Sequence, residues 1–184
     1  GVFSFPEGMA ASSRIRNLAH GMIETVPDVQ VVSMYGSEGK VFKSQKEHSS
    51  FSHIAILNMP RPKVSNIAIL RNRLEMYFKL SRLVDTTIEQ LDGSEQEVLF
   101  LYGRSYVFLS MLLRTLKRKG YKTKTVFDVV EPHRCTTSLF EYLKHPFLMD
   151  STLVFKCILN KFTACTYITK ALMERYAKNK AKSI

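Results

Sequence analysis

The sequence has 184 residues, of which 45% are hydrophobic and 23% are charged, so it can bury a substantial core and is neither disordered nor fibrous. Lys and Arg outnumber Asp and Glu by 27 to 16, which gives a formal charge of +11, a pI near 9.7 and a preference for anionic partners. The longest apolar runs, at residues 98–102 and 107–113, are far shorter than the roughly 20 residues that a membrane span needs.

The beginning of the sequence predicts a strand, a helix and a second strand. Residues 2–5 are apolar and Pro6-Glu7-Gly8 marks a turn, after which Ser12 and Ser13 precede apolar residues at helical spacing. Residues 29–34 alternate as a buried strand does and end at Tyr35-Gly36. We therefore expect a βαβ unit with a right-handed crossover.

A polar stretch and a long helix follow. Residues 37–52 predict a loop with at most one weak strand, and the brief apolar segment 54–57 is closed by Pro60-Arg61-Pro62. Residues 64–91 carry apolar side chains at a 3.6-residue period, which predicts a helix that ends at Asp92-Gly93. Its opposite face carries the cations Arg71, Arg73, Lys79 and Arg82.

The second half continues the alternation of strands and helices. Residues 98–102 form a continuous apolar run, typical of a strand buried on both faces, and Gly103-Arg104-Ser105 separate it from a helix that ends at Lys119 and is capped by Gly120. The last turns of that helix carry a basic cluster of Arg114, Lys117, Arg118 and Lys119. Further elements are predicted as a strand at 125–130, helices at 138–143 and 153–159, a strand at 164–168, a helix at 170–178 and a loose tail from Lys178 to Lys182. This order indicates an α/β fold with a three-layer, doubly wound, mostly parallel sheet.

The metal-binding and nucleophilic residue types form no recognisable motif. The three cysteines are odd in number and lack CxxC spacing, which argues against a disulfide framework or a zinc site and makes a reducing cytosol the expected location. Apart from His133, the histidines form no cluster with carboxylates or cysteines, so we expect no metal. The cysteines are Cys135, Cys157 and Cys165, and these histidines are His20, His48, His53 and His145. Without a GxSxG elbow, hydrolase chemistry has no support.

Ligands of doubly wound sheets bind beyond the carboxyl ends of the strands, and three segments lie there. In the first, residues 6–14, small side chains permit close approach to a ligand and the helix start offers amides to an anion, although Ser12 or Ser13 is equally suited to cap the helix. The GxGxxG and GxxxxGK[ST] patterns are absent, which disfavours dinucleotide and P-loop chemistry.

The other two segments carry charged side chains. Arg104, between Gly103 and Ser105, is suited to grip a phosphate or carboxylate, the alternative being a solvated surface arginine. Glu131, His133 and Arg134 crowd the end of the 125–130 strand, where proximity can tune a general acid or base. In the alternative interpretation Asp128 bonds a neighbouring loop and His133 lies at the surface.

The basic helix faces suit anionic lipid headgroups as well as nucleic acid. The 8 Tyr and 12 Phe lie mainly within apolar runs rather than among exposed Lys and Arg, and no nucleic-acid-binding motif is present. We therefore expect no nucleic-acid partner and keep an anionic membrane surface as an expected one.

Four segments, in order, resemble glycosyltransferase family 4-like enzymes. The opening FSFPEGMAASSRIRNLAHGM is similar to the first strand, loop and helix of that family, and LFLYGRS and TVFDVVEPHR to its fourth and fifth strands. CTYITKALMERY is similar to the closing strand and helix, where a Ser or Thr follows the strand and a Tyr ends the motif. The resemblance covers nearly the whole chain and implies one Rossmann-like half of a GT-B fold.

The resemblance implies that residues 1–184 are a single acceptor-side domain, and that the donor-binding domain with its paired glutamates is absent from this chain. Because the sequence begins at Gly1 without a Met or signal-like segment, we interpret it as trimmed or as a fragment. The expected reaction is transfer of a sugar from a nucleotide donor to a glycan or lipid-linked acceptor, with retention of anomeric configuration. Alone, the domain is expected to be inactive or nearly so.

The resemblance also assigns residues. Gly8, Met9, Ala10, Ser12 and Ser13 correspond to the loop that approaches the donor diphosphate, and Arg14 to the helix-start residue beside it. Glu131 and His133 correspond to the strand end that faces the sugar, and they are the expected catalytic residues.

The partners implied are a nucleotide-sugar donor shared with the second domain, an acceptor, and the cytoplasmic face of the membrane as a peripheral contact. Self-association of the isolated domain is expected, because it exposes its cleft face. The alternative function is a non-catalytic Rossmann-like module that binds an anionic ligand, a membrane surface or a partner subunit.

Overall fold

The computed structural model describes most of the helices and strands. It describes residues 4–5, 10–26, 28–36, 42–43, 50–57, 73–103, 105–130, 146–176 and 182–183. Of residues 4–5, 42–43, 50, 73–76, 146–147 and 182–183 only the backbone is described.

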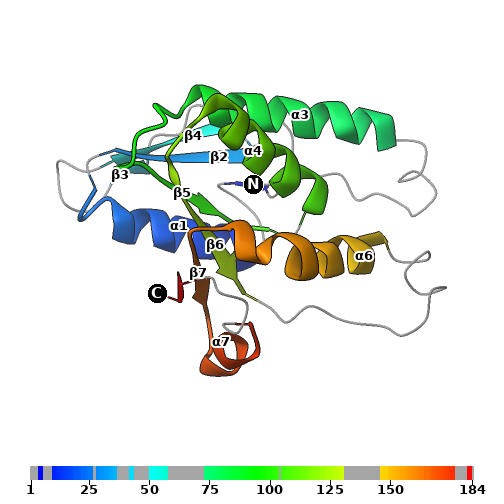
Figure 1. Cartoon of the computed structure of the whole chain (residues 1–184). Helices are drawn as coiled ribbons and strands as arrows, with labels where there is room; N and C mark the ends of the chain where they lie inside the picture. The colour runs from blue at the N-terminus through cyan, green and yellow to red at the C-terminus, as the bar shows by residue number, and fades with distance from the viewer. Residues whose placement is uncertain are drawn as a thin grey trace. The chain divides into compact units, whose positions relative to one another are not determined.

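The chain is an α/β protein with mainly parallel sheets, as expected for its fold class. Two compact units, Gly1–Thr87 and Ile88–Ile184, make up the chain, and each contains one four-stranded sheet. Figure 1 shows the helices and strands of both units.

The first unit begins with the predicted βαβ arrangement. Strand β1 (Ser4–Phe5) is followed by α1 (Ala10–Met22), and β2 (Val29–Gly36) pairs parallel with β1. The sheet is completed by β4 (Ser50–Leu57), parallel to β2, and by β3 (Phe42–Lys43), antiparallel to β4, in the order β1-β2-β4-β3.

Residues 37–57 contain more strand than expected. The two-residue strand β3 lies within the expected loop, and the apolar segment 54–57 belongs to an eight-residue strand, β4, that begins earlier, at Ser50. The sequence pattern hides the start of β4 because Ser52 and His53 lower the local hydrophobicity. Phe51 and His53 are buried and Ser52 is exposed, so the two-residue period of a strand is present.

Helix α3 (Arg73–Glu89) confirms the long helix for the described part of residues 64–91. Its core residues are Leu80, Leu83, Val84 and Ile88, whereas Tyr77 and Phe78, expected on the apolar side, are exposed. Arg82 is exposed and Lys79 half-buried, while Arg71 and the side chain of Arg73 lie outside the described residues.

In the second unit, four parallel strands follow one another across the sheet in chain order. The strands are β5 (Val98–Leu101), β6 (Lys124–Val129), β7 (Ala164–Tyr167) and β8 (Lys182–Ser183), and the order is β5-β6-β7-β8. The helices α4 (Tyr106–Lys119), α6 (Pro146–Leu153) and α7 (Lys170–Tyr176) lie between them in sequence. The predicted loose tail is wrong at Lys182, which pairs with Ala164.

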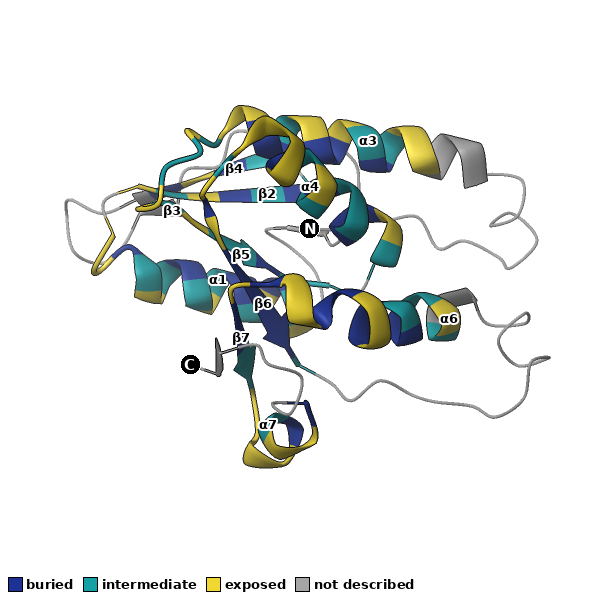
Figure 2. Cartoon of the chain, viewed as in Figure 1, coloured by how far each residue is buried: buried dark blue, intermediate teal, exposed yellow. Residues whose placement is uncertain are grey.

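The strand buried on both faces is β6 and not β5. All residues from Thr125 to Val129 are buried, whereas Leu101 is the only buried residue of β5 and Val98 is exposed (Figure 2). The apolar run 98–102 predicts a strand buried on both faces, and this expectation is wrong. Strand β5 is more exposed because it is an edge strand of its sheet. Strand β6 instead pairs with β5 on one side and β7 on the other.

Helix α4 has both predicted ends. The Ser105 hydroxyl accepts a hydrogen bond from the Phe108 N–H, and Gly120, in a left-handed conformation, donates to Leu116 and Lys117 carbonyls. Its buried residues Phe108, Leu109, Leu112 and Leu116 form one apolar face. The helix thereby leads from the carboxyl end of β5 back to the amino end of β6.

The helix expected at 153–159 begins earlier and changes form. Helix α6 ends at Leu153, Val154–Ile158 form a π-helix, and Leu159–Lys161 a 3-10 helix. Val154, Phe155, Ile158 and Leu159 are buried, so packing is maintained across the change of helical form. The helix expected at 138–143 lies outside the described residues.

Two glycines past helix ends provide a stability test. Gly93 and Gly120 both have positive φ, but a Cβ on Gly93 would lie 2.7 Å from the Tyr121 ring, whereas a Cβ on Gly120 meets no atom within 4 Å. Gly120→Ala should lower the free energy of unfolding by about 1 to 2 kcal/mol, from backbone strain alone. Gly93→Ala should lower the free energy of unfolding by roughly 1 to 3 kcal/mol more than Gly120→Ala, because the added Cβ collides with the Tyr121 ring. Equilibrium urea unfolding measures both; equal losses would contradict the close Tyr121 contact.

Candidate functional site

The first predicted ligand segment forms part of an open hollow on α1. Ala10, Ser13, Arg14, Asn17 and Leu18 line it, and their spacing places them on one face of the helix. A hydroxyl, a guanidinium and a carboxamide thus lie beside two apolar side chains. Such a surface can donate hydrogen bonds to a hydroxyl-rich or anionic ligand.

Ser12 lies on the other side of the helix. It is 2% exposed and shares the buried face of α1 with Ile15 and Ala19. Because α1 already begins at Ala10, Ser12 and Ser13 stand inside its first turn and not at the N-cap, so the capping interpretation is wrong. Gly8 and Met9 lie outside the described residues.

The second predicted segment already has an anion beside it, supplied by the chain itself. The Asp150 carboxylate of α6 accepts a hydrogen bond of 2.8 Å from the Tyr106 N–H and a further one from the Val107 N–H. With the Ser105 cap, the first amides of α4 are therefore occupied. The amides at the start of α4 thus bind a carboxylate of the chain itself.

Gly103 has φ of +108°, a conformation that favours glycine, and a Cβ there would meet no atom within 4 Å. It allows the chain to turn from β5 into α4. Gly103 and Ser105 therefore have local structural roles, and Arg104 lies outside the described residues.

Asp150 has the most clearly altered ionisation among the described carboxylates. Burial raises its pKa to about 6, and the two backbone hydrogen bonds only partly offset the effect. Sequence reasoning missed this residue, although an aspartate within the apolar segment PFLMDSTL is a signal that a carboxylate has a partner.

The third segment lies beyond the described residues, but the strand before it is described. Glu131, His133 and Arg134 are outside, whereas Asp128 of β6 is 2% exposed and accepts a 2.7 Å hydrogen bond from the Thr166 hydroxyl. This partner belongs to the adjacent strand β7, where Thr166 is the register neighbour of Asp128. The carboxylate thus joins the two strands within the sheet.

A buried serine and histidine pair is structural. The Ser33 hydroxyl donates to the Tyr35 carbonyl at 2.9 Å, and its oxygen is 2.8 Å from His53 Nε2. Because a hydroxyl has one proton, the imidazole must donate in the second bond. Ser33 is fully buried, so no substrate can reach its oxygen.

The remaining histidines and cysteines do not assemble into a reactive centre within the described ranges. His20 packs edge-on against Phe51, while His48, His145 and Cys135 lie outside the described residues. Burial raises the pKa of the Cys165 thiol to about 11, which keeps it protonated at neutral pH. Cys157 is an exposed thiol, and the described residues contain no group of three metal-ligating side chains.

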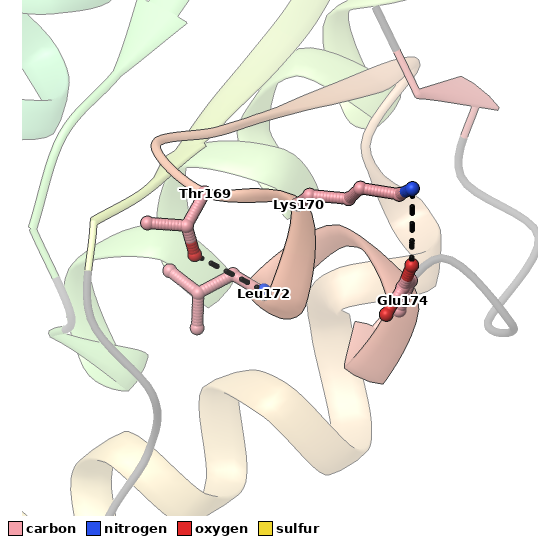
Figure 3. A network of polar contacts seen from close by, with 4 residues as sticks. All are labelled: Thr169, Lys170, Leu172 and Glu174. Carbon is pink, nitrogen blue, oxygen red and sulfur yellow. Dashed lines mark hydrogen bonds and ion pairs between the residues drawn. The ribbon is translucent and has the colours of Figure 1, made fainter.

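The closing motif has a structural explanation. The Thr169 hydroxyl accepts a hydrogen bond from the Leu172 N–H and so caps α7, and Lys170 pairs with Glu174 one turn on (Figure 3). Tyr176 is buried with its ring against Phe155. The threonine and tyrosine of this motif thus anchor α7 to its own unit.

No protein-family model, curated protein or solved structure matches the chain. Across the segments that the structure describes, no helix has both the length and the apolar character of a membrane span.

Ser33→Ala should lower the free energy of unfolding by about 1 to 3 kcal/mol, because it leaves the buried His53 N–H without its acceptor. Ser110→Ala is the matched control, since Ser110 bonds only to the Val107 carbonyl of its own helix. Its effect should stay within about 0.5 kcal/mol in urea unfolding. An equally small effect of Ser33→Ala would show that the buried pair contributes nothing.

Asp150 predicts a pH dependence of stability. Its folded pKa, about 6, is above its ordinary value of 3.8, so its stabilising contribution is complete below about pH 4 and is lost as the pH rises through 6. Asp150→Asn keeps an oxygen acceptor but does not ionise. The unfolding free energy of the wild type, relative to that of Asp150→Asn, should therefore decrease as the pH rises from 4 to 7.

Asp85→Asn, on the exposed side of α3, controls for the loss of one carboxylate. A constant difference between wild type and Asp150→Asn across this pH range would rule out a buried, titrating Asp150.

Proposed function

We propose that this chain is the acceptor-side domain of a retaining glycosyltransferase of the family 4-like type, with a doubly wound, Rossmann-like fold that forms one half of a GT-B enzyme. Its reaction is the transfer of a sugar from a nucleotide donor to a glycan or lipid-linked acceptor. The donor-binding half is supplied by a second domain.

The observation that carries the proposal is the polar hollow on α1. Helix α1 is the first helix after the first parallel strand, where a sheet of this kind binds its ligands. Ser13, Arg14 and Asn17 offer neutral and cationic donors, the groups that sugars and phosphates require. Ala10, Ser13 and Arg14 are also residues that the family resemblance assigns to substrate.

Parallel strand pairing supports the proposed fold. In a doubly wound sheet neighbouring strands run parallel and are joined by crossover helices. Strand β1 pairs parallel with β2 and β5 pairs parallel with β6, with α1 and α4 between them in sequence.

In the proposed reaction the residues have separate tasks. Arg14 and the small residues around it hold the phosphate-bearing or hydroxyl-rich substrate, and Glu131 and His133 act at the sugar. The protein must also position the acceptor and stabilise the departing diphosphate.

The experiment is an assay of the complete protein that contains this chain, with a panel of radiolabelled nucleotide sugars. Arg14→Ala should lower kcat/KM about tenfold or more, through loss of a charge-assisted contact with the substrate. Arg82→Ala, on the exposed part of α3, is the matched control and should leave kcat/KM unchanged. Glu131→Gln or His133→Ala should lower kcat about a hundredfold or more.

Failure to transfer or hydrolyse any donor would contradict the proposed function. Full activity of the Arg14, Glu131 and His133 variants in an active enzyme would instead contradict the site. Thermal unfolding of each variant separates loss of activity from loss of folding.

The second candidate is a non-catalytic module that binds an anionic ligand. The hollow on α1 favours it, because its lining includes Arg14 and the first turn of the helix contains no acid. This module would bind a nucleoside diphosphate in calorimetry, lose that binding with Arg14→Ala, and leave every nucleotide sugar intact.

A further inference from the structure

Exposed cations gather at the amino end of the sheet in the second unit. They come from the last turn of α4, from the segment between α4 and β6, from the start of β6 and from the 3-10 helix before β7. This group, the basic edge, consists of Lys117, Arg118, Lys119, Lys122, Lys124 and Lys161.

The topology places these residues together. Helix α4 ends before the amino end of β6, and the Tyr121 N–H bonds to the Leu116 carbonyl, so the chain turns sharply into the strand. The Thr163 N–H donates to the Thr125 carbonyl at 2.9 Å, which holds Thr163 beside the start of β6. Lys161, two residues earlier, thus lies at the same end of the sheet as Lys124.

The nearby carboxylates neutralise little of this charge. Glu95 pairs with Lys122 at 2.9 Å, with both side chains exposed. Glu97 accepts hydrogen bonds from the Asp92 and Gly93 amides and from the Thr123 hydroxyl. Lys117, Arg118, Lys124 and Lys161 form no ion pair with the described carboxylates.

The residue types of the basic edge favour phospholipid headgroups over single-stranded nucleic acid. Five of its six members are lysines, which act as flexible point charges and lack the bidentate geometry of arginine. The aromatic rings nearby are not available for stacking on bases, since Phe162 is buried against Phe127 and Tyr121 is half-buried with Lys119 over its ring. Diffuse lysine charge without a stacking surface suits phospholipid headgroups better than single-stranded nucleic acid.

We propose that the basic edge is a docking surface for membranes that contain anionic phospholipids. It lies at the opposite end of the β5-β8 sheet from the carboxyl ends, where ligands of parallel sheets bind. Membrane docking would therefore leave those ends accessible. This proposal is independent of any glycosyltransferase activity.

The test is sedimentation of the full 184-residue chain with vesicles of about one third phosphatidylserine and two thirds phosphatidylcholine, at about 0.1 M salt, where the Debye length is roughly 10 Å. The triple variant K117Q/K124Q/K161Q should bind on the order of a hundredfold more weakly than the wild type. The control R82Q/K170Q/R175Q removes the same charge from exposed positions on α3 and α7 and should bind within about threefold of the wild type.

Circular dichroism should show that both triple variants remain folded, because every substituted side chain is exposed. Equal losses by the two variants would overturn the proposal in favour of a response to net charge alone. No preference of the wild type for phosphatidylserine over pure phosphatidylcholine would also overturn it. So would tight binding of single-stranded RNA that the first triple variant abolishes while vesicle binding is unchanged.

Discussion

The burial of β6 on both faces is the constraint on which the second unit depends. Its five buried residues include Asp128, and a carboxylate inside a sheet is costly unless it is hydrogen-bonded. Thr166 meets that need from β7, while the Phe127 ring stacks on Phe162 with centroids 4.9 Å apart. At the amino end, the Thr125 N–H donates to the Thr163 hydroxyl. Polar and apolar contacts of β6 therefore hold β7 and the residues just before it in place.

How much of this the sequence predicts depends on how local the cause is. The ends of α4 follow from Ser105 and Gly120, because a cap is decided within a few residues. The burial of strands is not local. The apolar runs at β5 and β6 resemble each other, yet β5 lies at a sheet edge and β6 between two strands. Strand β4 was underestimated because its buried His53 is polar, and its partner Ser33 lies 20 residues away in sequence.

The candidate site divides in the same way. Ala10, Ser13 and Arg14 were expected from the residues after the first strand, and Asn17 and Leu18 join them through helical periodicity. That periodicity was available in the sequence and would have found both. The partner of Asp150 was out of reach, since Asp150 contacts the start of α4 from 44 residues further along the chain. For Glu131, His133 and Arg134 the assignment still rests on sequence alone.

The purely parallel sheet of the second unit also has a consequence for biosynthesis. Thr125 and Thr163 are 38 residues apart, and parallel strands cannot be joined by a tight hairpin. On the ribosome, β6 therefore waits for a whole crossover to be synthesised before its second neighbour arrives. During that interval the run Thr125–Val129 is an unpaired, largely apolar strand edge, the kind of segment that associates with other chains. Faster elongation would shorten this interval, and a chaperone that covers the strand would protect it during the interval. Either would raise the yield of folded protein.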